Sequence, residues 1–262
     1  MQPGGHPVAF ARAAVALTAL GSLGILVLIP ITAWQVADIP GLPVPPITLA
    51  AIAAIQPFIL LVLGALAGAF AAPRLGLGSV LAERASGVGT GPEVLRGLGW
   101  IVFVSVLLGA AINLVDELAQ PLWVPAGVQW LSTAETWSPV AFVFGILYGG
   151  LTEEVIFRWG LMSVAAWALW RLSGSAKAPP RWTFVAAIAV SALIFGAGHL
   201  PALAGMMPLS PGPIIRTVVL NAVAGTWLGW LFWRRHLEAA MLGHAAVHVG
   251  FAAYAVPMIV WT

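Results

Sequence analysis

The sequence contains no cysteine and few charged residues. None of its 262 residues is Cys, and Asp, Glu, Lys and Arg together make up only 8%. The absence of cysteine excludes disulfides, thiolate metal sites and a cysteine nucleophile. Charged residues make up about 25% of an ordinary soluble domain, so that class is excluded as well. With a net charge of only +2 and no basic run interleaved with aromatics, nothing indicates nucleic-acid binding.

Hydrophobic residues dominate instead, at 61% of the chain. About 20 apolar residues cross a bilayer as a helix. Seven stretches are long enough, namely Ala13–Ala37, Ile47–Ala72, Leu98–Val115, Pro139–Trp170, Trp182–Leu200, Pro213–Trp233 and Ala239–Val260. The fourth is too long for one upright helix, and an eighth helix can lie there or in Pro201–Pro213. We therefore predict an all-α, polytopic transmembrane helix bundle of about 7–8 helices, with residues 1–262 as a single integral membrane domain.

The basic residues predict the orientation. Nine of the eleven lie before the first span or in the loops after spans two, four and six, namely Arg12, Arg74, Arg84, Arg96, Arg171, Lys177, Arg181, Arg234 and Arg235. The opposite loops carry only acidic charges, namely Asp38, Asp116, Glu117 and Glu135. Cytoplasmic loops are enriched in Lys and Arg, so we expect a cytoplasmic N-terminus. The Ala-, Gly- and Pro-rich composition favours a bacterial plasma membrane.

Three charged residues lie close together in the fourth span: Glu153, Glu154 and Arg158. A charge at the centre of a membrane helix costs roughly 2.5–3.5 kcal/mol on insertion scales, so three of them indicate a functional site. Glu154 and Arg158 are four residues apart with the acid first, which favours an ion pair. In an α-helix Glu153 lies about 100° away from Glu154, so we expect it to face a cavity. The alternative is a charge cluster that only holds helices together.

Three histidines lie in or at the edge of apolar spans. His199 ends the fifth span, four residues after Phe195, which can pack against its ring. His244 and His248 share one face of the seventh span. Two chemistries fit. In one, Glu153 and His199 deprotonate a water that attacks an amide, while the other two histidines donate hydrogen bonds to the oxyanion. In the other, histidines and a glutamate bind Zn²⁺. A zincin-type helix is excluded because His-Glu-x-x-His is absent.

Taken in order, these motifs resemble those of the CPBP family of CAAX prenyl proteases and bacteriocin-processing enzymes, also called Abi. The resemblance rests on Glu-Glu-x-x-x-Arg at 153–158, Phe-x-x-x-His at 195–199 and His-x-x-x-polar at 244–248. It covers roughly residues 139–249, which we expect to form the catalytic core. The resemblance implies an intramembrane endopeptidase.

The resemblance also implies roles for individual residues. It assigns the reaction to six of them, namely Glu153, Glu154, Arg158, His199, His244 and His248. In the family the first Glu acts on the water with support from the second Glu and the Arg. The His of the second motif shares the water, and the last motif forms the oxyanion hole. Family members usually have Asn or Asp where this chain has His248, whose imidazole can donate to an oxyanion and is also the better metal ligand. The implied mechanism requires no cofactor, and zinc is the alternative.

Three functions are therefore weighed. The leading hypothesis is an endopeptidase acting on a peptide or protein in or at the lipid bilayer, of CAAX type or with a leader peptide. A second is a membrane transporter or proton-coupled carrier, in which buried Glu and His relay protons. Pseudo-symmetric halves would support that, and the sequence has none. A third is a non-catalytic immunity or scaffold protein whose polar residues only bind a partner.

Overall fold

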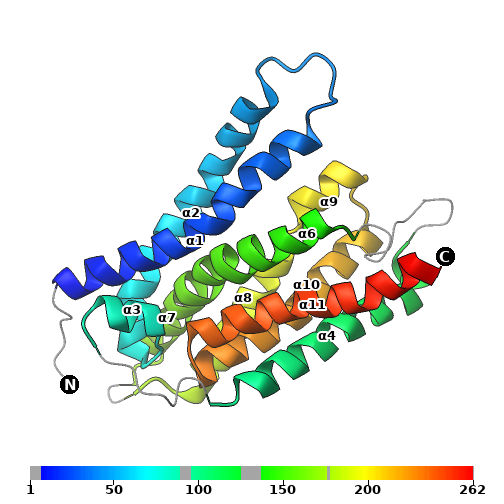
Figure 1. The fold of residues 1–262 in the computed structure, drawn as a ribbon. Helices are drawn as coiled ribbons and strands as arrows, with labels where there is room; N and C mark the ends of the chain where they lie inside the picture. Colours follow the sequence, from blue (N-terminus) through cyan, green and yellow to red (C-terminus); the bar gives the residue numbers. More distant parts are fainter. Residues whose placement is uncertain (1–6, 89–95, 125–136, 176–177, 262) are drawn as a thin grey trace.

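The protein is a bundle of long helices (Figure 1). The computed structural model describes residues 7–88, 96–124, 137–175 and 178–261. Lys177 and Glu135, two of the loop charges from which the orientation is predicted, lie outside these residues. The helices are α1 (Pro7–Gln35), α2 (Pro46–Leu75), α3 (Val80–Ala85), α4 (Leu98–Leu118), α5 (Gln120–Trp123), α6 (Pro139–Phe144), η2 (Gly145–Met162), α7 (Ser163–Leu172), α8 (Arg181–Ala197), α9 (Leu200–Met206), α10 (Pro211–Arg234) and α11 (Leu237–Trp261).

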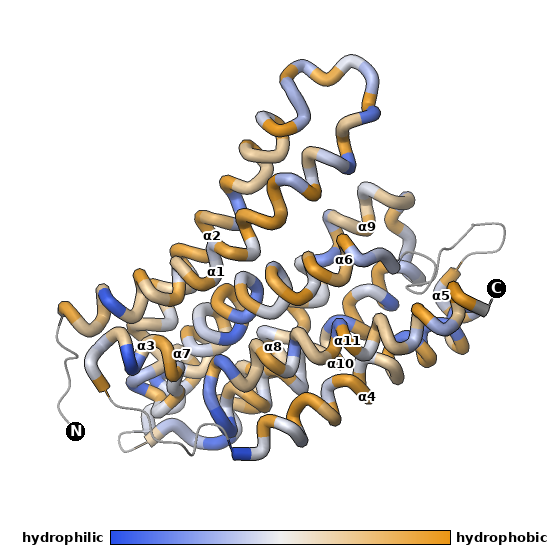
Figure 2. Tube along the Cα trace, in the orientation of Figure 1, coloured by the Kyte–Doolittle hydropathy of each residue, from blue (hydrophilic) through white to orange (hydrophobic). Residues whose placement is uncertain are grey.

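Seven helical segments of the described chain are long and apolar enough to cross a membrane. They correspond one to one with the seven stretches predicted from the sequence, and no strand occurs in the described residues. Hydrophobic residues occur along the whole length of these helices (Figure 2), and many of the large ones are exposed. The prediction of an all-α, multi-pass integral membrane protein is confirmed. A helix suits such a segment because lipid offers no partner for an unpaired backbone group.

Local signals fix where several helices begin and end. Prolines occupy the first turns of α2, α6 and α10, where their missing N–H is not needed. At the start of α6 the Ser138 hydroxyl accepts a hydrogen bond from the Ala141 N–H at 3.1 Å. Gly76 ends α2 with a φ of 73°, a conformation that favours glycine.

The fourth span is one continuous helical run, Pro139–Leu172, made of α6, η2 and α7. Its central part, η2, is a π-helix whose hydrogen bonds span five residues rather than four. A π-helix has more residues per turn, so it advances less per residue than an α-helix. The wider coil therefore accommodates a 34-residue span that is too long for one upright α-helix. The extra helix lies in the other predicted place. It is α9, too short to cross a membrane alone, and it continues the fifth span to Met206.

The helix η2 lies in the middle of the bundle. It packs against α1 and α2 on one side and against α8 and α11 on the other. Elsewhere in the bundle α4 packs against α11, and α10 packs against both α8 and α11. The hairpin of α1 and α2 diverges from the other helices toward its connecting loop (Figure 1). The side chains of η2 are thus surrounded by helices from both ends of the sequence.

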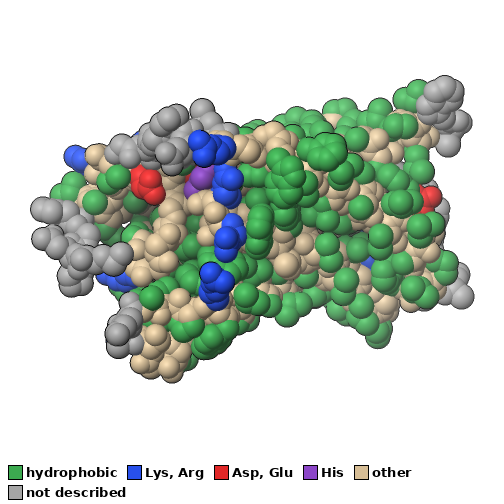
Figure 3. Space-filling view, turned by 90° about the horizontal axis from the view of Figure 1, so that it is seen from below, with side chains coloured by type: hydrophobic (Ala, Val, Ile, Leu, Met, Phe, Trp, Pro, Cys, Tyr) green, Lys and Arg blue, Asp and Glu red, His purple; other side chains and the backbone are tan. Residues whose placement is uncertain are grey.

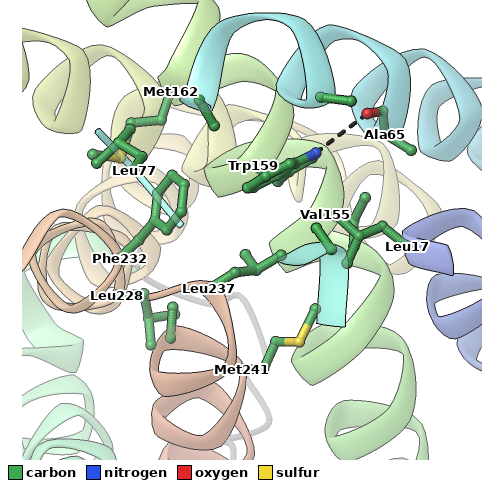
Figure 4. Close-up of a cluster of buried hydrophobic side chains, with 14 of the residues drawn as sticks. Leu17, Ala65, Leu77, Val155, Trp159, Met162, Leu228, Phe232, Leu237 and Met241 are labelled. Atoms are coloured by element: carbon green, nitrogen blue, oxygen red, sulfur yellow. Dashed lines mark hydrogen bonds between the residues drawn. The ribbon is translucent and has the colours of Figure 1, made fainter. Parts of the chain in front are cut away.

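A hydrophobic core joins η2 to its neighbours toward the end of the bundle where α1 begins (Figures 1 and 4). The Trp159 ring of η2 is 2% exposed, and its indole N–H donates to the Ala65 carbonyl of α2 at 3.2 Å. The Thr152 hydroxyl donates to the Gly21 carbonyl of α1 at 2.6 Å. Both bonds link η2 to another helix, which fixes its position along the membrane normal.

Charged side chains lie mostly away from the apolar middle. Several Lys and Arg side chains gather near one end of the face drawn in Figure 3. At the start of α11, Glu238 accepts hydrogen bonds from the Ser79 hydroxyl at 2.7 Å and from the N–H of Val80 and Leu81 at 2.9 Å. Near the opposite end Arg216 of α10 pairs with Asp116 of α4. These contacts join loops and helix ends, and they leave the charges of η2 as a separate group.

Candidate active site

The three charged residues of η2 differ in exposure. The side chains of Glu154 and Arg158 are 0% and 1% exposed, while that of Glu153 is 15% exposed. Arg158 Nη1 lies 3.2 Å from Glu154 Oε1, so the ion pair predicted from the four-residue spacing is confirmed. In the described chain this contact lacks hydrogen-bond alignment, and none of the three guanidinium nitrogens has a hydrogen-bond partner. The pair is therefore held by charge and packing.

A second partner of Glu154 comes from α11. His244 Nδ1 lies 2.7 Å from Glu154 Oε1, the same oxygen that contacts Arg158. From the sequence, Arg158 was the only predicted partner of Glu154. The histidine was missed because the two residues are 90 positions apart and no local pattern connects them. A hydrogen bond at Nδ1 fixes the orientation of the ring and turns Nε2 toward the rest of the site.

His244 lies between the two glutamates. Its Nε2 is 3.9 Å from Glu153 Oε2, beyond direct hydrogen-bond length. A polar separation of this size is one that a bridging water fits. Gly149 permits the approach, since a Cβ there would lie 2.9 Å from His244 Nε2 and 3.2 Å from His248 Nε2. The Nε2 atoms of the two histidines therefore meet at the same point on η2.

His248 packs against the ring of His244. Their centroids are 5.3 Å apart and their planes 8° from parallel, which confirms that they share one helix face. A side chain at Gly145 would collide with the His248 ring, so only glycine allows η2 to come this close. Within the described residues neither ring nitrogen of His248 has a hydrogen-bond partner. Its nitrogens are thus available to a ligand.

His199 approaches the same group from the turn between α8 and α9. It interacts electrostatically with His248, and its Nδ1 lies 2.8 Å from the Phe195 carbonyl oxygen. The predicted packing of Phe195 on His199 is confirmed, with centroids 4.8 Å apart. Among the described residues, Glu153 and His199 form no direct hydrogen bond or ion pair. Any water that they share must bridge a longer gap.

The π-helix changes how the charges of η2 relate to each other. Hydrogen bonds spanning five residues place residues five apart on successive turns. Arg158 therefore interacts with Glu153, five residues earlier, as well as with Glu154. Tyr148, five residues before Glu153, interacts with it electrostatically too. The α-helical geometry used for the sequence prediction places residues five apart on different faces, so it missed both interactions.

The donors present do not form a ready metal site. In the part of the chain that the structure describes, no three His, Asp or Glu side chains are placed to share one metal ion. The Nδ1 of His244 is already engaged by Glu154. Zinc binding stays a prediction, as do the catalytic roles of the six residues.

Comparison with known proteins bears on what this arrangement does. A family model described as type II CAAX prenyl endopeptidase Rce1-like matches residues 135–250. The match includes η2, α8, α10 and most of α11, and thus all six candidate residues. No curated protein and no solved structure matches the chain significantly.

Proposed function

We propose that this chain is an intramembrane endopeptidase, because residues 135–250 match the family model of the Rce1-like type II CAAX prenyl endopeptidases, which are proteases. It hydrolyses a peptide bond of a substrate that lies in or at the membrane, of CAAX type or with a leader peptide. One observation carries the proposal: a buried row in which Glu154, His244 and Glu153 follow one another at 2.7 and 3.9 Å. A helix-stabilising ion pair needs only one carboxylate, and this site has two.

Glu153 is the proposed general base. Of the two carboxylates it is the more exposed, and Arg158 does not contact it as it contacts Glu154. A water between Glu153 and His244 loses a proton to Glu153 as its oxygen bonds to the carbonyl carbon of the substrate. Glu153 then gives that proton to the leaving nitrogen as the C–N bond breaks. His199 helps to hold the water or the substrate.

We assign to His248 the hydrogen bond that stabilises the oxyanion. When His244 donates its Nδ1 proton to Glu154, the neutral ring has only a lone pair at Nε2 and cannot donate there. It donates from both nitrogens only as an imidazolium. His248 has no such constraint, and its Nε2 lies on the same side as that of His244. In many hydrolases, donors placed in advance around a developing oxyanion contribute more to the rate than any other group.

Glu154 and Arg158 act through their neighbours. Glu154 holds the orientation of His244, in the way that a buried carboxylate orients a catalytic histidine. Arg158 balances the two adjacent negative charges. We place the catalytic core at residues 139–249. The proposed orientation in a bacterial plasma membrane, with a cytoplasmic N-terminus, follows the distribution of basic residues.

The proposal is tested with purified protein in lipid nanodiscs and two fluorogenic peptides, a farnesylated CAAX peptide and its unprenylated counterpart. We expect cleavage of at least one, and a loss of roughly 10²–10⁴-fold in kcat for Glu153→Gln, the usual contribution of a general base. Glu83→Gln in α3 is the matched control and keeps wild-type activity. A Glu153→Gln protein that cleaves at the wild-type rate would exclude the mechanism. Elemental analysis of the same samples tests the zinc alternative.

A further inference from the structure

We propose that Phe195 is a positioning residue. Its ring keeps Arg158, His199 and His244 at fixed distances from one another, and it does so through the charge distribution of its π-system. The inference rests on the function proposed above. The side chain is 2% exposed and lies on α8, where it meets η2 and α11. It touches no group that reacts, so its effect is exerted through its neighbours.

The face of the ring is occupied by Arg158. The guanidinium carbon lies 4.5 Å from the Phe195 centroid, well within the range of a cation–π contact. In the described chain the guanidinium nitrogens have no hydrogen-bond partner, and the carboxylate of Glu154 is the charge closest to them. The electron-rich face of Phe195 therefore adds to the stabilisation that the charges of Glu154 and Glu153 give this buried cation. Without it, Arg158 would be free to move away from Glu154.

Two histidines contact the same ring. Its centroid is 4.8 Å from that of His199 and 5.9 Å from that of His244. The interplanar angles are 78° and 87°, the edge-to-face arrangement that aromatic pairs favour. One histidine lies in the turn between α8 and α9 and the other lies in α11, and no other ring of the described residues contacts both. A shift of Phe195 therefore changes the distance between these two groups.

Phe195 is itself firmly held. Phe157 of η2 packs edge-on against it at 5.2 Å. The Ser191 hydroxyl of α8 donates to the Phe157 carbonyl at 2.9 Å, which joins the two helices one turn away. On the next residue, a side chain at Gly196 would collide with the backbone of Val218, so α8 cannot move further toward α10. A ring fixed on rigid helices can hold its neighbours to the tolerance that catalysis needs.

Leucine offers a test because it keeps apolar bulk and removes the ring. We expect Phe195→Leu to lower kcat by roughly 100-fold, the loss that a misplacement of about 1 Å can produce. KM should change little, and the pH profile of kcat should shift, although Phe195 does not titrate. The matched control is Phe184→Leu. Phe184 lies on the same helix, is 6% exposed and stacks on Trp233 at 5.2 Å, away from the site.

A second variant separates charge distribution from shape. Phe195→pentafluorophenylalanine keeps the shape and reverses the ring quadrupole. We expect it to lose activity as Phe195→Leu does, while the same replacement at Phe184 has no effect. Wild-type kcat in either Phe195 variant would overturn the proposal. The fluorinated variant keeps the test decisive if the leucine variant does not fold.

A readout without turnover distinguishes this proposal from the proposed function. In protein labelled with ¹⁵N-histidine, Phe195→Leu should move the ring-nitrogen shifts of two of the five histidines, and Phe184→Leu should move none. If the wild type cleaves no peptide yet these shifts move, the proteolytic function fails and the positioning role stands. Unmoved shifts in Phe195→Leu would contradict the positioning role whatever the activity.

Discussion

At the scale of single residues, one carboxylate oxygen serves two positively charged or polar partners. Glu154 Oε1 contacts Arg158 at 3.2 Å and His244 at 2.7 Å. Its other oxygen is buried and has no hydrogen-bond partner among the described residues. All the attraction is thus concentrated on one side of the carboxylate. Loss of its charge removes the counter-ion of Arg158 and the orienting partner of His244 together.

Glu154→Gln should therefore destabilise the protein strongly. Removal of one partner of a buried ion pair leaves the other charge uncompensated, at a cost of about 3–5 kcal/mol. Glu153→Gln is the matched comparison and should cost far less, because Glu153 is more exposed and has no direct ion pair with Arg158. Unfolding in detergent, followed by tryptophan fluorescence, measures both. Equal stability of the two variants would mean that Glu154 does not balance Arg158.

The sequence predicted those contacts whose two residues lie four positions apart. The pairing of Glu154 with Arg158, the packing of Phe195 on His199 and the shared face of His244 and His248 all follow from a spacing of four. The contact between Glu154 and His244 does not, because it depends on which helices are neighbours. Hydropathy carries no such information, since every span is apolar on the side that faces lipid.

At the scale of elements, the π-helix η2 and α11 approach each other over two glycines. Gly145 and Gly149 leave room for the rings of His248 and His244. Most bounds of the spans were predicted to within three residues, because the length of an apolar run is set by the membrane, while the start of the first span and the end of the fifth were missed by five and six residues. The π-helical geometry was not, since it leaves the same residues in the same apolar run and only changes their angles.

A methyl group at Gly149 should disturb the site without unfolding the helix. Its Cβ would lie 2.9 Å from His244 Nε2, so one of the two must shift. We expect Gly149→Ala to lower kcat by roughly 100-fold, because the histidine moves relative to Glu153. The control is Gly99→Ala in α4, which meets nothing within 4 Å and should leave activity unchanged. If Gly149→Ala cleaves as fast as the control, the close approach of these two helices has no bearing on the reaction.

At the scale of the whole molecule, the absence of cysteine makes the orientation measurable. Single cysteines at Asp38 and Leu172 lie at opposite ends of the predicted topology, and both positions are exposed. With a cytoplasmic N-terminus, Asp38→Cys should react with a membrane-impermeant maleimide in intact spheroplasts. Leu172→Cys should react only after lysis. The reverse pattern would overturn the predicted orientation.

The packing of the spans against one another could not be predicted from the sequence, although their number could. The sequence predicted seven spans and the residues that they carry, but not that η2 lies between the α1–α2 pair and α8 and α11. Such neighbours are chosen by small residues and single hydrogen bonds, such as that from Trp159 to Ala65. These signals are too local to identify a partner helix without the structure.

The bond between Glu154 and His244 also has a consequence for biosynthesis. Its two halves are 90 residues apart, and chains emerge N-terminus first at about 5–20 residues per second. The carboxylates of η2 thus leave the ribosome roughly 5–18 s before the histidine that completes the row. Under the proposed function, a chain assembled in this order is inert while it is being inserted. It then attacks neighbouring nascent chains only once the span that carries His244 has docked.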